Sequence, residues 1–193
     1  MTMPVVLRPA ERRDAAELAV LIDIASHSFA TWLWYGGVLR GESETAMEHG
    51  RARMRDDRQQ GGWRDAVIAE IGGDVAGLAV GYRLDETVAT APSDHPALEP
   101  LLVLQRPLAG HWFVDSLAVY RRHRRYGIGR QLMADQIARS GGGPVSLITE
   151  SYNDAAQALY GSLGFAEAAR CEAVPLYDNS KKHDWVLMTR NAA

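Results

Sequence analysis

The sequence predicts a mixed α/β fold in which a central sheet of about seven strands is flanked by helices. Apolar segments of strand length alternate with segments whose apolar residues recur at helical spacing. With 193 residues, 47% of them hydrophobic, the chain is long enough to bury a sizeable core. No linker rich in proline, glycine or serine divides it, so we expect one domain over residues 1–193.

In the first third of the chain, one strand and two helices are predicted. The apolar segment 4–8 is short and contains β-branched residues, as is typical of a strand. A helix follows Pro9, because apolar residues recur there at i, i+3, i+4 and i+7, namely Leu18, Leu21, Ile22 and Ala25. A second helix is predicted over residues 44–60, where Gly61-Gly62 ends a polar segment with a thin apolar stripe.

A β-hairpin is predicted next, because two apolar runs, 66–71 and 75–82, flank Gly72-Gly73-Asp74. The segment 83–110 contains four prolines around one apolar patch. A connection of this length is usually functional or mobile, and this one could form a lid. The remaining elements are clearer: strands at 111–119, 145–150, 165–174 and 185–188, and helices at 127–139 and 154–163.

Composition excludes several classes of function. Lysine plus arginine is 21 and aspartate plus glutamate is 24, so the net charge of −3 argues against a nucleic-acid coat protein or a polybasic membrane anchor. The single cysteine, Cys171, excludes an intrachain disulfide framework and a multi-cysteine zinc site, and we expect no metal. There is no apolar run of about 18 residues and no signal-peptide pattern, so we expect a cytoplasmic protein without a membrane span.

The most informative segment is a basic, glycine-containing turn between a strand and a helix. Four arginines occur in the five positions 121–125, and Gly127 and Gly129 follow them. The first N–H groups of a helix lack intrahelical partners, so glycines and arginines placed there favour a phosphate site. The alternatives are an ordinary surface run of arginines and a nucleic-acid patch, which would require a more extensive basic face.

Two motifs resemble those of the GNAT superfamily of N-acetyltransferases. Residues 124–129 match the element R/Q-x-x-G-x-G/A, in the expected strand–turn–helix context. Residues 153–165 match the element N-x-x-A-x-x-L-Y-x-x-x-G-F, with Ala156 as the alanine in register. The resemblance covers 112–165 most clearly, and it implies a mostly antiparallel sheet and the use of acetyl-CoA as cosubstrate.

The resemblance also implies how acetyl-CoA would be held. The turn would bind the pyrophosphate through its main-chain amides, the preceding strand would pair with the pantetheine arm, and Asn153 would contact that arm. The implied cofactor-binding residues are Leu117, Ala118, Val119, Arg124, Arg125, Tyr126, Gly127, Ile128, Gly129, Arg130, Asn153 and Tyr160.

Two residues are predicted to be catalytic. Tyr160 would stand near the thioester sulfur as general acid, as the resemblance implies, and the alternative is a core tyrosine with a satisfied hydroxyl. Asp115 interrupts the apolar strand WFVDSLAV, where a charge is costly unless it is paired or used, so it is the first candidate for the general base. The alternative is a structural aspartate that holds a bulge or pairs with an arginine. Glu150 is the second candidate for the base.

Three other titratable residues are weaker candidates. His111 is expected to begin a strand, and His123 lies inside a basic turn, where its charged form would be disfavoured. Cys171 is expected to be a buried strand residue without a neighbouring base, so direct transfer is simpler than a covalent acyl-cysteine.

The acceptor site is expected between the first two predicted helices, where Trp32, Trp34 and Tyr35 cluster. Aromatic side chains there could line an apolar site or cradle a cation, together with Glu150. The alternative is that they belong to the core, which is the more favoured interpretation for at least one tryptophan. The acceptor is expected to be a small-molecule amine or a peptide, with neither nucleic acid nor membrane as partner.

The leading hypothesis is therefore an N-acetyltransferase in which an acceptor amine attacks acetyl-CoA directly in a ternary complex. The first alternative is a non-catalytic module that senses acyl-CoA. Use of another acyl group or of a hydroxyl acceptor also stays open. The exposed edges expected of a mixed sheet favour a homodimer.

Overall fold

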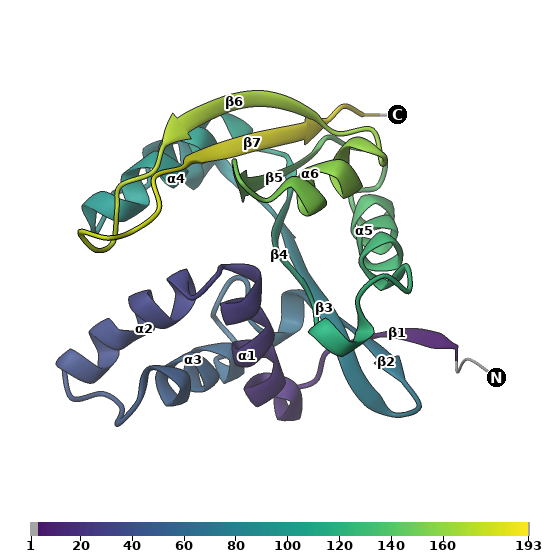
Figure 1. Ribbon diagram of the computed structural model, residues 1–193, viewed down its shortest axis with the longest axis horizontal. Helices are drawn as coiled ribbons and strands as arrows, with labels where there is room; N and C mark the ends of the chain where they lie inside the picture. Colours follow the sequence, from purple (N-terminus) through teal and green to yellow (C-terminus); the bar gives the residue numbers. More distant parts are fainter. Residues whose placement is uncertain (1–3, 193) are drawn as a thin grey trace. The chain divides into compact units, whose positions relative to one another are not determined.

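The computed structural model describes residues 4–192 and contains a sheet of seven strands with six α-helices (Figure 1). The helices and strands fall into two compact units. The first unit runs to Tyr82 and resumes over Asp115–Gln136, and the second comprises Arg83–Val114 and the chain from Ile137 onwards.

The strands lie in the order β1-β2-β3-β4-β5-β7-β6. Antiparallel pairing joins β1 to β2, β2 to β3, β5 to β7 and β6 to β7, whereas β4 and β5 are parallel. The prediction of a mixed, mostly antiparallel sheet flanked by helices is therefore confirmed. The bounds are β1 Val5–Pro9, β2 Ala66–Ile71, β3 Asp74–Arg83, β4 Trp112–Val119, β5 Val145–Glu150, β6 Ala166–Glu172 and β7 Asp184–Arg190.

The helices include two that the sequence analysis did not predict. The bounds are α1 Ala15–Ala25, α2 Phe29–Leu39, α3 Ala46–Arg55, α4 Glu99–Gln105, α5 Ile128–Arg139 and α6 Asp154–Gly161. The prediction of an irregular connection over 83–110 was wrong, because this segment folds into α4 and three short 3-10 turns. The helix predicted over 44–60 is shorter than expected, since α3 begins after the Thr45 cap and ends before Asp56.

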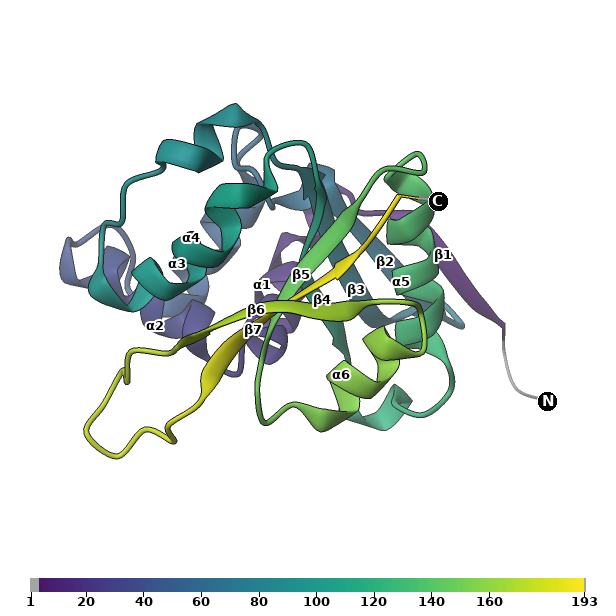
Figure 2. The ribbon, with the colours of Figure 1, turned by 90° about the horizontal axis from the view of Figure 1, so that it is seen from above.

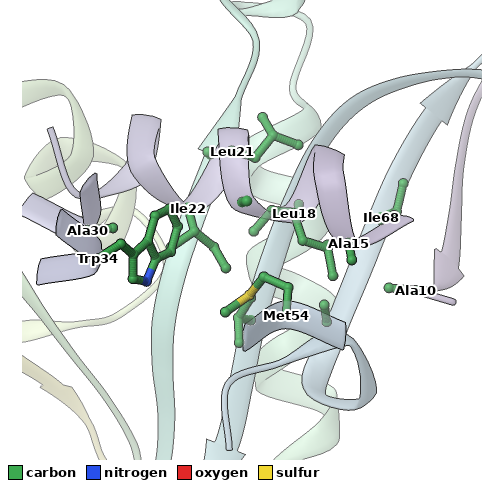
Figure 3. Packing of buried hydrophobic residues seen from close by; sticks show 14 of the residues in the cluster. Ala10, Ala15, Leu18, Leu21, Ile22, Ala30, Trp34, Met54 and Ile68 are labelled. Carbon is green, nitrogen blue, oxygen red and sulfur yellow. The ribbon is translucent and has the colours of Figure 1, made fainter. Parts of the chain in front are cut away.

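The core of the first unit lies between the helices α1, α2 and α3 and the strands beside them. Leu18 and Leu21 on α1 and Ile68 on β2 are completely buried (Figure 3). Trp34 of α2 packs into the same cluster, where an added Cβ on Gly50 of α3 would lie 2.4 Å from its ring. Burial of these apolar side chains supplies the main driving force for holding the three helices against the sheet.

In the second unit, β7 lies between β5 and β6 in the sheet. Leu147 of β5 pairs with Met188 of β7, and β7 in turn pairs with β6, which lies at the edge (Figure 2). Most side chains of β6 are exposed, so Cys171 is only partly buried. The prediction of a buried cysteine was therefore wrong, because β6 has a sheet neighbour on one side only.

Candidate active site

The basic turn lies in the first unit, between the end of β4 and the start of α5. Two residues of this turn adopt positive φ angles, Arg125 at 72° and Gly127 at 78°. Gly127 suits this conformation because it has no Cβ, whereas an arginine in it is strained by about 1 kcal/mol or more. The turn therefore holds a specific backbone shape between the end of β4 and the start of α5.

The start of α5 presents donors to that turn. The Gln131 N–H donates to the carbonyl of Gly127, in the turn, at 3.1 Å, and this is the first helical hydrogen bond that a turn residue accepts. The N–H groups before Gln131 therefore come too early for intrahelical bonds, and they carry the positive end of the helix dipole. Ile128 is 1% exposed and anchors this first turn in the core.

The arginines of the turn have different environments. Arg124 donates from Nε to the Val119 carbonyl at 3.0 Å, and Arg122 donates from Nε to Nε2 of His123 at 2.9 Å. Arg125 and Arg130 are also exposed to solvent. The structure therefore brings the basic residues together with the end of β4, as the sequence analysis expected, and His123 accepts a hydrogen bond from Arg122.

Asp115 lies on β4 in the first unit, and two hydroxyl groups hold its carboxylate. Tyr82 of β3 donates to Oδ1 at 3.1 Å, and Ser116 donates to Oδ2 at 3.0 Å. The side chain is accessible to solvent. Desolvation by the surrounding protein nevertheless raises the pKa of Asp115 above its ordinary value, against the effect of the two hydrogen bonds. A carboxylate with a raised pKa is better suited to accept a proton near neutral pH.

Tyr82 is the site residue that sequence analysis missed. It ends an apolar run in the hairpin strand, and no motif marks it. Desolvation, followed by the charge of Asp115, raises the pKa of its hydroxyl well above the ordinary value. The Tyr82 hydroxyl therefore stays protonated at neutral pH and can donate a hydrogen bond.

Glu150, Asn153 and Tyr160 lie close together in the second unit. Glu150 is the last residue of β5, is 5% exposed, and accepts the Asn153 N–H through its main-chain carbonyl at 3.0 Å. The Asn153 side chain caps α6 by accepting the Ala156 N–H at 3.3 Å. Its carbonyl oxygen therefore takes part in the fold, and its NH₂ group is able to donate to a ligand.

Tyr160 is on α6 and is 8% exposed. Its ring contacts Phe165, with the ring centroids 6.1 Å apart. No residue in the described part of the chain, 4–192, hydrogen-bonds to its hydroxyl. Desolvation, followed by the charge of Glu150, raises the pKa of this hydroxyl, so it stays protonated at neutral pH.

The aromatic cluster proposed for the acceptor lies on α2, in the first unit. Trp34 is 6% exposed and belongs to the core, as the sequence analysis favoured for one tryptophan. Tyr35 is 53% exposed, and Trp32 is partly buried and stacks on Phe29 with a centroid distance of 5.7 Å. Of the three, Tyr35 and Trp32 are therefore the ones whose side chains remain accessible to solvent.

His111 precedes β4 rather than beginning it, so that prediction was wrong by one residue. Its Nδ1 atom is buried and has no hydrogen-bond partner within residues 4–192, and burial lowers the pKa of the imidazole. Over residues 4–192, no group of three or more His, Cys, Asp or Glu side chains could hold a metal ion. No helix in the same range is long and apolar enough to cross a membrane.

The mixed sheet, and the basic, glycine-containing turn that leads from β4 into α5, agree with the resemblance seen in the sequence. The sequence pattern described as the acetyltransferase (GNAT) family matches residues 31–165, and the chain belongs to this family. Among curated proteins, none matches the chain by sequence.

Solved structures share the fold over nearly the whole chain. An N-acetyltransferase from Staphylococcus aureus is 17% identical, with a TM-score of 0.66 over 95% of this chain and 99% of that one. The ribosomal-protein-alanine N-acetyltransferase from Brucella melitensis is 22% identical, with a TM-score of 0.63 over 96% and 99%. The Salmonella typhimurium protein yncA, whose structure holds its cofactor acetyl-CoA, is 20% identical, with a TM-score of 0.60 over 97% and 94%. At these identities the likeness establishes the fold.

Proposed function

We propose that this protein is an N-acetyltransferase that moves an acetyl group from acetyl-CoA to a primary amine by direct attack in a ternary complex. The observation that carries the proposal is the turn in which Arg125 and Gly127 adopt positive φ at the start of α5. Membership of the acetyltransferase (GNAT) family supports the reaction class. The acetyl-CoA in the Salmonella typhimurium structure supports the choice of cosubstrate.

The residues of the turn fit a polyphosphate ligand. An added Cβ on Gly127 would meet no atom within 4 Å, so the turn is open on that side. Arg124, Arg125 and Arg130 are exposed and supply positive charge beside the helix N-terminus. We propose that the amides of 124–129, together with these side chains, hold the pyrophosphate, and that the main chain of 117–119 and Asn153 hold the pantetheine arm.

Asp115 is proposed as the general base. An ammonium group cannot attack a thioester, so the acceptor must lose a proton before its C–N bond forms. The solvent-accessible Asp115 carboxylate, with its raised pKa, takes this proton directly or through a water molecule. Glu150 is the second candidate, and its 5% exposure makes it less accessible to an acceptor.

Tyr160 is proposed as the general acid. When the C–S bond of the thioester breaks, the sulfur leaves as a thiolate and needs a proton. The Tyr160 hydroxyl is protonated at neutral pH and has no hydrogen-bond partner within residues 4–192, so it is able to donate. The hydroxyl is restored from solvent after CoA leaves as the free thiol.

The acceptor is proposed to be a small-molecule amine or a peptide. Tyr35 and Trp32 offer aromatic surface on α2, which can pack against an apolar group or a cation. The similar structure from Brucella melitensis is named a ribosomal-protein-alanine N-acetyltransferase, so peptides belong in the acceptor panel.

The test is a steady-state assay of CoA thiol release over a panel of amines, peptides and hydroxyl compounds. Amine-dependent release supports the proposal. Release with hydroxyl compounds alone would assign a different acceptor class. Acetyl-CoA binding without acceptor-dependent release would indicate a sensing module, which is the second candidate.

A further inference from the structure

The Asp115 carboxylate is held on both of its oxygen atoms. Tyr82 donates to Oδ1 from the neighbouring strand β3, and Ser116 donates to Oδ2 from β4 itself. A carboxylate can accept about four hydrogen bonds, so each oxygen keeps capacity for a further donor. The two hydroxyls therefore fix the plane of the carboxylate without exhausting it.

The chain at Gly61, before β2, passes beside the ring of Tyr82. Gly61 lies against it, since an added Cβ at Gly61 would be 3.4 Å from Cε1 of Tyr82. Gly61 has a positive φ of 77°, and its N–H donates to Oδ2 of Asp65 at 2.8 Å. A side chain at this position would strain the backbone, and its Cβ would be in ordinary van der Waals contact with the ring, so glycine lets the chain pass beside the phenol without strain.

We propose that Tyr82 is a positioning residue for the general base, orienting the Asp115 carboxylate toward the acceptor and stabilising its charged form. The proposal rests on the proposed function, because it takes Asp115 as the base. Tyr82 itself does not exchange a proton with the acceptor.

The groups around Asp115 act on it in opposite directions. Desolvation and the charge of Asp65, from the turn before β2, raise the pKa of Asp115, while the hydroxyls of Ser116 and Tyr82 lower it. Loss of the Tyr82 hydroxyl leaves the raising influences less opposed. The pKa of Asp115 then increases, and a smaller fraction of the protein carries the base in its reactive, ionised form.

The test begins with the pKa of Asp115, measured by ¹³C NMR titration of aspartate-labelled protein and assigned with Asp115→Asn. We expect Tyr82→Phe to raise this pKa by about one unit, because a hydrogen bond to a charged group contributes on that order. Tyr120→Phe is the matched control, since Tyr120 donates in the same way to the Glu17 carboxylate. It should leave the pKa of Asp115 unchanged.

The second measurement is the pH profile of kcat/KM. In Tyr82→Phe the acidic limb should move to higher pH by the same amount, with the activity lost on that limb recovered on raising the pH and the KM for acetyl-CoA unchanged. An unshifted Asp115 pKa, or a shifted pKa with an unshifted limb, overturns the proposal. A wild-type protein that releases no CoA with any acceptor overturns the proposed function instead, and the NMR titration still decides whether Tyr82 stabilises the Asp115 carboxylate.

Discussion

Arg124 donates from its Nε atom to the carbonyl oxygen of Val119 at 3.0 Å, which ties the basic turn to the last residue of β4. The same side chain therefore has two roles. Its Nε holds the turn to the end of β4, and the side chain remains exposed to solvent. Arg124 therefore contributes both to the backbone shape of the proposed phosphate site and to its positive charge.

Replacement of Arg124 by alanine should therefore weaken acetyl-CoA binding more than loss of a neighbouring charge does. We expect the dissociation constant to rise about tenfold, the order expected for a lost charge-assisted contact. Arg121→Ala is the control, because Arg121 is exposed and lies outside the residues proposed to hold the cofactor. Calorimetry on both variants makes the comparison, and equal effects would contradict a specific role for Arg124.

Gly127→Asp should abolish acetyl-CoA binding, because it adds a negative charge where the pyrophosphate is proposed to lie and a side chain at a φ of 78°. The backbone strain alone is matched by Gly142→Asp. Gly142 also has a positive φ, of 84°, and an open surrounding, but it lies outside the proposed site. That control should lose stability of about 1 kcal/mol and bind acetyl-CoA normally. Normal binding by Gly127→Asp would refute the phosphate site.

Tyr160→Phe should lower kcat by roughly 100-fold, the lower range for loss of a general acid, while acetyl-CoA binding is unchanged. The pH dependence has a definite sign. Because the pKa of Tyr160 is raised, its hydroxyl stays protonated and donates at every pH below about 10, so it should produce no alkaline limb in that range. Unchanged turnover in this variant would remove Tyr160 from the mechanism.

The sequence predicted the strands of the first unit and β5 almost to the residue, because glycine-bounded apolar runs mark them clearly. It missed α2, whose sequence FATWLWYGGVL is apolar on most sides and so shows no helical period. It missed α4 because prolines surround it, although Pro100 near the helix start is compatible with helix geometry.

The turn of 124–129 could be predicted because its signal is local in sequence. The pairing of Tyr82 with Asp115 could not, since it depends on the alignment of two strands across the long connection between them. The exposure of each aromatic residue on α2 was equally hidden, because Trp34 and Tyr35 are adjacent in sequence and opposite in burial.

Removal of one buried hydroxyl group is predicted to stabilise the protein. Ser146 on β5 is completely buried, and within residues 4–192 its Oγ atom has no hydrogen-bond partner. Ser146→Ala should leave the free energy of unfolding unchanged or raise it by about 1 kcal/mol. Ser140→Ala is the control, because the Ser140 hydroxyl donates to the Ile137 carbonyl at 2.8 Å and its loss should destabilise the protein. Chemical denaturation measures both, and a clear loss in Ser146→Ala would contradict the assignment.

Asp14 predicts a pH dependence of stability. Arg8 binds both of its carboxylate oxygens, at 2.7 and 3.1 Å, and lowers the pKa of Asp14. The stabilisation is therefore complete above the unfolded-state pKa of about 4 and is lost as pH falls through the lower folded-state pKa.

Asp14→Asn should accordingly reduce the free energy of unfolding by about 2 kcal/mol at neutral pH, with the difference from wild type shrinking in acid. Glu11→Gln breaks the exposed pair with Arg13 and should have little effect. Thermal unfolding of both variants at several pH values tests this, and a pH-independent deficit in Asp14→Asn would contradict the electrostatic account.

The central claim is acetyl transfer from acetyl-CoA to an amine. Its most direct test is mass spectrometry of the acceptor panel after incubation with acetyl-CoA that carries an isotopically labelled acetyl group. The account predicts a labelled amide in the presence of wild-type protein, with much less from Tyr160→Phe and none from Gly127→Asp. Unlabelled acceptors beside intact acetyl-CoA, under conditions where acetyl-CoA binds, would contradict it.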